Sequence, residues 1–194
     1  MNCFFAQIEQ QDNPFWRNRP VAVTNGRQGS TIITSSYEAR AYGVKTGMRL
    51  KEARQLCPDI IQAPSRPHRY AEISTKIMKG LESITPNLEV YSVDEAFLDV
   101  THCQSLLGLP LQIAQRVKDT VSNVSGLTCS VGVSGDKTTA KYAAKLNKPD
   151  GLTQILPWEA EETLAPLLVT ELSGINIGTA NFLKQYGVVT CGDM

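Results

Sequence analysis

Hydrophobic and polar residues recur along this chain with two different spacings, which separate predicted helices from predicted strands. Helical spacing, with apolar residues three and four positions apart, marks residues 67–83 and 110–124. The first stripe comprises Tyr70, Ile73, Ile77, Leu81 and Ile84, and the second comprises Ile113, Ala114, Val117, Val121 and Val124. Each stripe predicts an amphipathic helix with one face in a hydrophobic core.

Short runs rich in β-branched and aromatic residues predict strands around these two helices. The runs cover residues 1–9, 20–24, 31–35, 60–63, 88–93, 96–100, 127–134 and 153–156. Shorter helices are predicted at 36–43, 47–57 and 136–146, and the region from residue 159 is all helical. This order predicts an α+β fold, in which a ferredoxin-like antiparallel or mixed sheet is backed by the two amphipathic helices.

Two adjacent acids interrupt the strand pattern between residues 88 and 101. A strand sends neighbouring side chains to opposite faces, so Asp94 and Glu95 can share a ligand only where the strand ends or bends. We therefore predict two short strands that meet at an acidic corner. Adjacent carboxylates repel each other, and a bound cation would stabilise them. On spacing alone, the simpler interpretation of a hairpin tip with two solvated acids is favoured.

A second candidate cluster lies in the helix predicted from Ser36 to Gly43. Ser36 is placed to cap its start and Gly43 to end it. Tyr37 and Arg40 are three residues apart and share a face. A phenol and a guanidinium near a helix start suit an anion such as phosphate. Spacing alone favours a solvent-facing arginine packed over a tyrosine.

Composition narrows the class of protein without identifying a substrate. The chain has 194 residues, 42% of them hydrophobic, and 19 basic residues balance 19 acidic ones, so net charge argues neither for nor against nucleic acid. No apolar run reaches membrane-spanning length and no signal peptide begins the chain, which predicts a cytoplasmic protein. The five cysteines are scattered, and the two histidines are far apart, which disfavours a zinc site and a histidine-based nucleophile.

Four spaced motifs, in one order, make the chain resemble a known family. They are M-N-C-F-F-A, S-Y-E-A-R-A-Y-G-V-K-T-G-M, Y-S-V-D-E-A-F-L-D-V and S-V-G-V-S-G-D-K-T-T-A-K-Y-A-A-K-L-N-K-P-D-G, followed by a late S-G-I-N-I-G. This set is similar to Y-family (translesion) DNA polymerases of the DNA polymerase IV/UmuC kind, from Met1 to roughly Tyr186. The resemblance implies a palm at 1–25 and 63–157, inserted α/β fingers at 26–62, and at 158–194 a partial thumb with a helix–hairpin–helix.

The resemblance also implies a reaction and a set of site residues. The reaction is template-directed transfer of a nucleotide from a deoxynucleoside triphosphate to a primer 3′-OH, with two Mg²⁺ ions and Mn²⁺ as the other suitable metal. Asp94 and Glu95 match the catalytic metal-binding acids, and the main-chain carbonyl of Met1 matches a third ligand. The nucleotide-binding positions are Phe5 as steric gate against a ribose 2′-OH, Thr34, Tyr37, Arg40 and Lys148, and the DNA-binding positions are Gly174 and Gly178.

Two departures from the family pattern lead us to expect a fragment. The family motif opens D-[hydrophobic]-[DN]-x-F-[FY]-A, and this chain starts at the hydrophobic position, so the first metal-binding aspartate is absent. Asn2 is neutral and occupies the third position, so it cannot replace that aspartate. The rest of the thumb and the little-finger domain are also absent. We expect this chain alone to bind triphosphate weakly and not to extend a primer.

The expected partners are primer–template DNA and deoxynucleoside triphosphates, with no membrane, and a sliding clamp would bind through the absent C-terminal part. The expected role is translesion synthesis during DNA repair and the SOS response to DNA damage. Two alternatives remain. A nucleotide cyclase also has a ferredoxin-like palm, but S-Y-E-A-R argues against it. A non-catalytic polymerase-like subunit of the DNA damage response fits the absent aspartate but not the retained Asp94 and Glu95.

Overall fold

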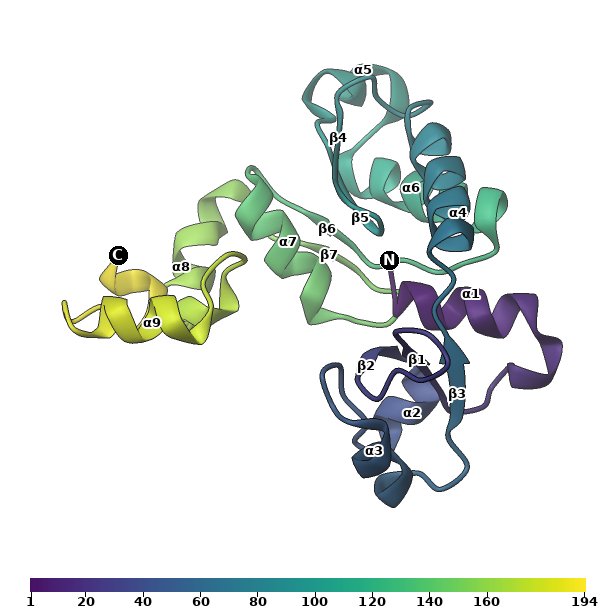
Figure 1. Ribbon diagram of the computed structural model, residues 1–194. Helices are drawn as coiled ribbons and strands as arrows, with labels where there is room; N and C mark the ends of the chain where they lie inside the picture. The colour runs from purple at the N-terminus through teal and green to yellow at the C-terminus, as the bar shows by residue number, and fades with distance from the viewer. The chain divides into compact units, whose positions relative to one another are not determined.

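The computed structural model describes all of residues 1–194 as short helices and three small sheets (Figure 1). The chain divides into two compact units, which are described separately. The first unit comprises residues 1–83, 88–96 and 120–127, and the second comprises residues 84–87, 97–119 and 128–194. The mixed α/β class predicted from the sequence is confirmed. None of the helices combines the length and the apolar character that a membrane-spanning segment requires.

The largest sheet lies in the first unit and is built around β1 (Val21–Thr24). This strand pairs antiparallel with β2 (Ile32–Ser35) and parallel with β3 (Ile61–Pro64), and all four of its residues are buried. Two short helices, α2 (Tyr37–Ala41) and α3 (Leu50–Leu56), complete this part. Its core consists of Ala22, Ile32, Ala39, Val44, Leu50, Ala53, Cys57 and Ile60.

The N-terminal segment is a helix, and the strand predicted over residues 1–9 is wrong. The helix α1 spans Phe4–Asp12 and packs against β1 and β2. Phe4 and Ile8 lie one helical turn apart, and both are buried. Alanine, glutamine and glutamate favour helix, and the aromatic pair that suggested a strand packs equally well on one helical turn. Cys3 precedes the helix in the left-handed conformation, at φ 31°.

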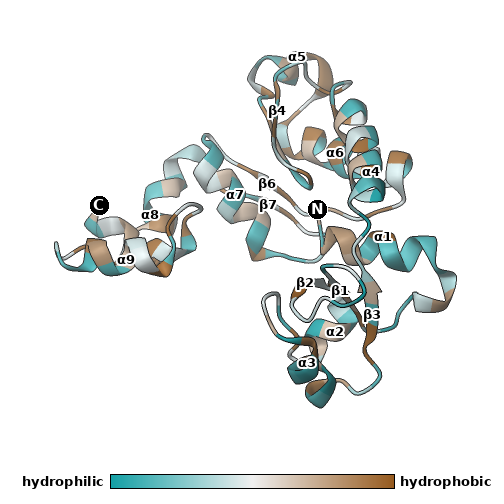
Figure 2. Cartoon of the chain, in the orientation of Figure 1, coloured by the Kyte–Doolittle hydropathy of each residue, from teal (hydrophilic) through white to brown (hydrophobic).

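The two long amphipathic helices are confirmed. The helix α4 (Pro67–Leu81) begins with proline at its first position, and its whole predicted stripe, with Ile84, is buried. Figure 2 shows polar and apolar residues alternating along it. In α6 (Pro110–Ser125), Ile113, Ala114 and Val121 are buried, while Val124 is 40% exposed. Val124 lies in the last turn of α6, beside Gly80 of α4. A Cβ added at Gly80 would lie 3.2 Å from Val124.

The remaining strands form two separate two-stranded sheets. One is the hairpin of β4 (Leu88–Ser92) and β5 (Glu95–Leu98), and the other pairs β6 (Val131–Val133) in parallel with β7 (Leu152–Gln154). The observed pairing therefore does not form the single continuous sheet that was expected. The run at 127–134 forms a strand of only three residues, β6. Periodicity identifies candidate strands, but it does not show which strands pair with one another.

The second unit carries α7 (Lys137–Leu146), which lies beside β6 and β7 (Figure 1). Asp136 caps this helix by accepting a hydrogen bond from the backbone N–H of Thr139 at 2.9 Å. Glycine at 132 permits close packing, because a Cβ there would collide with the backbone of Ala140 and Ala144. The other helices are α5 (Gln104–Leu107), α8 (Ala160–Leu164) and α9 (Ile177–Lys184).

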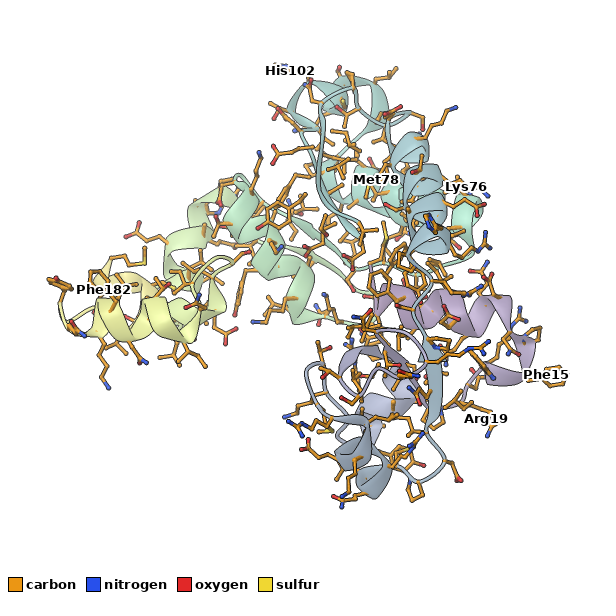
Figure 3. All side chains as sticks on the ribbon, in the orientation of Figure 1. Phe15, Arg19, Lys76, Met78, His102 and Phe182 are labelled. Atoms are coloured by element: carbon orange, nitrogen blue, oxygen red, sulfur yellow. The ribbon has the colours of Figure 1, made fainter.

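Single 3-10 turns join these elements, at Pro14–Trp16, Thr101–Cys103, Pro157–Glu159, Val169–Glu171 and Cys191–Asp193. Several turns and helix ends present large apolar side chains to solvent. Phe15 is 84% exposed in the turn after α1, and Phe182 is 56% exposed on α9 (Figure 3).

Candidate active site

The predicted acidic corner is present between β4 and β5. Strand β4 ends at Ser92 and β5 begins at Glu95, so Asp94 lies in the turn between them. Its side chain is therefore free of the alternation that sends neighbouring strand residues to opposite faces. The hydroxyl of Ser92 lies 3.1 Å from Asp94 Oδ1 and 3.4 Å from Glu95 Oε2. A hydroxyl has one hydrogen, so it donates to one of these carboxylates at a time. Both carboxylates therefore converge on one side of the corner.

The N-terminal end of the chain meets this corner. The nitrogen of Met1 donates to the backbone carbonyl of Asp94 and lies 3.9 Å from Asp94 Oδ2. The Asp94 side chain remains 34% exposed. Asn2 is buried, and its carbonyl accepts a hydrogen bond from the Gln7 amide. Met1 thus lies beside Asp94 through its nitrogen, and Asn2 is enclosed in the protein.

Cys3 connects this N-terminal segment to the start of α2. The backbone N–H of Tyr37 faces the Cys3 thiol, and the charges of Arg40 and Glu38 act on it. Burial raises the pKa of the Cys3 thiol to about 11, against an opposing effect of the Arg40 charge. The thiol is therefore neutral at physiological pH and acts as a packing group. A chain of contacts runs from Asp94 through Met1 and Cys3 to α2.

The start of α2 is held by its cap and carries the predicted phosphate-binding side chains. Ser36 Oγ accepts hydrogen bonds from Ala39 N at 3.4 Å and from Val21 N at 3.1 Å. The Arg40 guanidinium lies 4.9 Å from the centroid of the Tyr37 ring, and its Nε donates to the Ser35 carbonyl at 3.1 Å. The expected packing of arginine over tyrosine is thus observed, with Arg40 largely exposed.

Tyr37 adds an unpaired polar atom to the start of α2. Its hydroxyl is buried and has no hydrogen-bond partner. Burial also raises the pKa of Tyr37, so the hydroxyl keeps its proton and can donate it. An unsatisfied buried hydroxyl is costly, and such groups are rare without a functional reason. The neighbouring Thr34, on β2, is only 9% exposed.

Phe5 lies in the first turn of α1 and is half-buried. Its ring stacks on that of Tyr70, with centroids 4.3 Å apart and planes 16° from parallel. Phe4 is buried beside it, at 5.7 Å between ring centroids. Phe5 is therefore held on one side by an aromatic ring from α4.

Sequence analysis assigned Tyr70 to the core but did not identify the polar group behind it. The Tyr70 hydroxyl donates to Glu9 Oε1 at 2.7 Å, and Arg66 Nε donates to the same oxygen at 2.9 Å. Glu9 is buried, with a side chain only 5% exposed. The signal in the sequence was the spacing of Phe5 and Glu9, which share one face of a helix. The incorrect strand prediction concealed it, since a strand would place these residues far apart.

The remaining predicted residues lie in the second unit. Lys148 follows α7 and is exposed. Gly174 has φ +94°, which strongly favours glycine, with open space where a Cβ would project, and Gly178 lies in α9. Asn176 caps α9 through a 2.9 Å hydrogen bond from Thr179 N. The structure therefore groups Met1, Phe5, Thr34, Tyr37, Arg40, Asp94 and Glu95 in one unit, and Lys148, Gly174 and Gly178 in the other.

Comparison with known proteins identifies the class to which this fold and site belong. The impB/mucB/samB family model matches residues 1–145, so the chain belongs to this family. The chain is 41% identical to DNA polymerase IV of Moorella thermoacetica and 39% identical to that of Shewanella baltica. Each match covers 100% of this chain, and 49% and 54% of the respective relatives. The chain thus spans about half the length of the curated relatives it matches.

Solved structures agree with the sequence comparison. The insertion ternary complex of Dbh DNA polymerase matches with a TM-score of 0.88 and 35% identity, over 99% of this chain and 57% of that one. The crystal structure of DinB from Sulfolobus solfataricus matches with a TM-score of 0.86 and 33% identity, over 99% of this chain and 57% of that one. The predicted resemblance to Y-family DNA polymerases is confirmed.

Proposed function

We propose that the protein carrying this sequence performs template-directed DNA synthesis past damaged bases. One observation carries the proposal: the paired carboxylates at 94 and 95 are joined, through Met1 and Cys3, to the helix that presents an unsatisfied tyrosine hydroxyl and an exposed arginine. Metal-binding acids beside a triphosphate-binding surface are what nucleotidyl transfer needs. The relatives named DNA polymerase IV support the same activity.

The donor set at the corner fits a hard divalent cation. Asp94 and Glu95 offer carboxylate oxygens on one side of the turn, and Asp94 stays partly exposed. Oxygen donors of this kind suit Mg²⁺ and also Mn²⁺. Bound Mg²⁺ supplies charge neutralisation of the triphosphate and activation of the primer hydroxyl. The main-chain carbonyl of Met1 would add a neutral oxygen ligand.

The side chains of the first unit would bind and orient the nucleotide. The Tyr37 hydroxyl would donate to a phosphate oxygen, which would satisfy the buried group. The Arg40 guanidinium, already fixed over the Tyr37 ring, would pair with the phosphates together with the Thr34 hydroxyl. The ring of Phe5 would lie against the sugar and exclude a 2′-hydroxyl.

Three further residues come from the family resemblance. Lys148 would reach the triphosphate, and Gly174 and Gly178 would allow backbone N–H groups to approach a DNA phosphate. In this proposal the palm comprises 1–25 and 63–157 with a ferredoxin-like arrangement, the fingers 26–62, and the beginning of a helix–hairpin–helix thumb 158–194. The protein would act in the cytoplasm, and a sliding clamp would bind outside this chain.

Primer extension tests the proposal. The complete protein encoded by the gene that carries this sequence is given a primer–template, four deoxynucleoside triphosphates and Mg²⁺, on undamaged templates and on templates with a lesion. We expect extension on both, and its loss in Asp94→Ala. No extension by the wild-type protein would favour the non-catalytic polymerase-like subunit instead.

A further inference from the structure

We propose that Glu9 is a positioning residue for sugar selection, acting on Phe5 through Tyr70. The inference rests on the proposed function, since it concerns which nucleotides the site accepts. Glu9 touches no expected substrate group, and the resemblance to polymerases assigned it no role. Three contacts support the role of Glu9: the Phe5–Tyr70 ring stack, the Tyr70–Glu9 hydrogen bond and the Glu9–Arg66 ion pair.

The geometry makes Tyr70 a single rigid link between two residues of one helix. Phe5 and Glu9 are four residues apart on α1, so they lie one turn apart on the same face. Phe5 holds the ring of Tyr70 by stacking at 4.3 Å, and Glu9 holds its hydroxyl at 2.7 Å. Tyr70 itself is 3% exposed. A ring fixed at its face and at its hydroxyl cannot tilt without breaking one of these contacts.

Burial makes the Glu9 contact hard to replace. A buried carboxylate needs partners, and Glu9 Oε1 has both the Tyr70 hydroxyl and Arg66 Nε. Charge-assisted hydrogen bonds are shorter and stronger than neutral ones, so this acceptor fixes the hydroxyl more firmly than a neutral group would. Burial, followed by the hydrogen bond to Glu9, raises the pKa of Tyr70, so its hydroxyl stays a donor.

The position of Phe5 matters because of where α1 begins. Met1, four residues earlier, contacts Asp94 at the acidic corner, and Cys3 contacts the start of α2. Phe5 therefore lies in the first turn beyond the segment that joins the metal-binding acids to the phosphate-binding surface. A barrier to a 2′-hydroxyl works by steric contact, so a small displacement of the ring changes which sugar fits.

Selectivity between sugars separates a positioning role from a merely structural one. General loss of folded protein lowers the kcat/KM for deoxynucleotides and ribonucleotides equally, so the ratio of the two does not change. Displacement of Phe5 changes that ratio. The variants are Tyr70→Phe, which removes only the hydroxyl, and Glu9→Gln, which keeps the side-chain size but loses the ion pair with Arg66.

The matched control is Asp12→Asn. Asp12 lies further along α1 and pairs with the same Arg66, at 2.8 Å, and with Arg69, but its contacts are with these arginines and not with Tyr70. Ion pairs continue from Arg69 to Glu72 and from Glu72 to Lys76. Figure 3 shows Lys76 on α4. Asp12→Asn thus disturbs the same connection between α1 and α4 without releasing the tyrosine hydroxyl.

The experiment measures single-nucleotide insertion of dNTP and rNTP by the complete protein. We expect the selectivity for dNTP to fall about three- to tenfold in Tyr70→Phe, the effect of one lost hydrogen bond to a carboxylate, and by less in Glu9→Gln, whose amide oxygen still accepts from the Tyr70 hydroxyl. Asp12→Asn should keep the wild-type ratio.

Three results would overturn the inference. An unchanged ratio in Tyr70→Phe, with normal dNTP insertion, removes the positioning role and leaves the proposed function intact. An equal fall in Asp12→Asn shows general loosening between α1 and α4 instead. Absence of dNTP insertion by the wild-type protein ends the proposed function, and this inference with it.

Discussion

The ring of Phe5 stacks on the ring of Tyr70 at 4.3 Å, although the two residues come from different helices far apart in the chain. Replacing Phe5 by valine removes the ring but leaves Tyr70 held by Glu9. We expect Phe5→Val to raise ribonucleotide insertion by at least tenfold while dNTP insertion changes little, because the barrier is steric. Single-nucleotide kinetics with matched dNTP and rNTP measure this.

Phe4→Leu is the control for that substitution. Phe4 is 2% exposed, so its truncation creates a cavity and lowers stability by about 1–3 kcal/mol. It should leave the dNTP-to-rNTP ratio unchanged. Equal relaxation of selectivity by both variants would mean that Phe5 has no specific place at the sugar.

The unsatisfied hydroxyl of Tyr37 predicts opposite effects of its removal on protein stability and on triphosphate affinity. Tyr37→Phe removes a buried donor that has no partner, so the free energy of unfolding should stay the same or rise by about 1 kcal/mol. The same change should weaken triphosphate binding about three- to tenfold, because a hydrogen bond to a charged phosphate is lost. Urea unfolding and nucleotide titration measure the two effects.

The exposed Tyr42, at the end of the same helix, provides a matched control. Tyr42→Phe should change neither stability nor triphosphate affinity. If Tyr37→Phe destabilises the protein and leaves nucleotide affinity intact, the hydroxyl serves the fold and not a ligand.

The two carboxylates at the hairpin corner should make stability depend on Mg²⁺. We expect Mg²⁺ to raise the Tm of the chain, because a ligand that binds only the folded state stabilises it. Glu95→Gln relieves repulsion between the acids, so without metal its Tm should equal or exceed that of the wild type. The increase with Mg²⁺ should then be reduced or lost.

Thermal unfolding with EDTA and with a Mg²⁺ series gives both comparisons. Glu89→Gln alters an exposed acid on the same hairpin, outside the corner, and should retain the wild-type response. A full Mg²⁺ response in Glu95→Gln would contradict the assignment of this side chain as a metal ligand.

The arginines around Asp12 predict how stability changes in acid. The hydrogen bond from Arg69 lowers the pKa of the Asp12 carboxyl below its usual value. The hydrogen bond from Arg66 lowers it by a smaller amount, and burial acts in the opposite direction. A carboxyl with a lowered pKa in the folded state contributes stability above its unfolded pKa, near 4, and loses it as the pH falls through the folded value. The loss should therefore occur below about pH 4.

Urea unfolding from pH 7 down to pH 2 measures this contribution. Asp12→Asn should flatten the acid limb of the stability profile, and Glu162→Gln, an exposed acid on α8, should not. An unchanged acid limb in Asp12→Asn would show that the pairing with Arg66 and Arg69 adds nothing to stability.

The side chain of Lys118 anchors the turn that carries Lys148. Its ammonium group, in a side chain only 13% exposed, donates to the carbonyl of Cys129 at 3.2 Å and to Asp150 Oδ1 at 2.6 Å. Lys118→Met should cost about 1–2 kcal/mol and weaken triphosphate binding, since the turn at 147–151 loses its anchor. Lys184→Met, at the exposed end of α9, is the control, and equal effects of both would contradict an anchoring role.

Local sequence was sufficient to predict features that lie within a single helix or turn. The stripe of α4 is buried as its spacing required, Ser36 caps α2, and the two acids lie where the hairpin turns. These features depend on residues a few positions apart, so propensity, capping and periodicity predict them. The N-terminal segment was predicted incorrectly, because its aromatic residues suit a strand and its alanine, glutamine and glutamate suit a helix.

The sequence by itself determined the family, the two amphipathic helices and the acidic corner between two short strands. Only the tertiary structure decided that Met1 lies against Asp94, that Cys3 meets the start of α2 and that Glu9 holds the Tyr70 hydroxyl. The physical reason is that these contacts join residues far apart in the chain. Helical and strand periodicity report which face of an element is buried, while the partner on that face is selected by packing and by the need to satisfy buried polar groups.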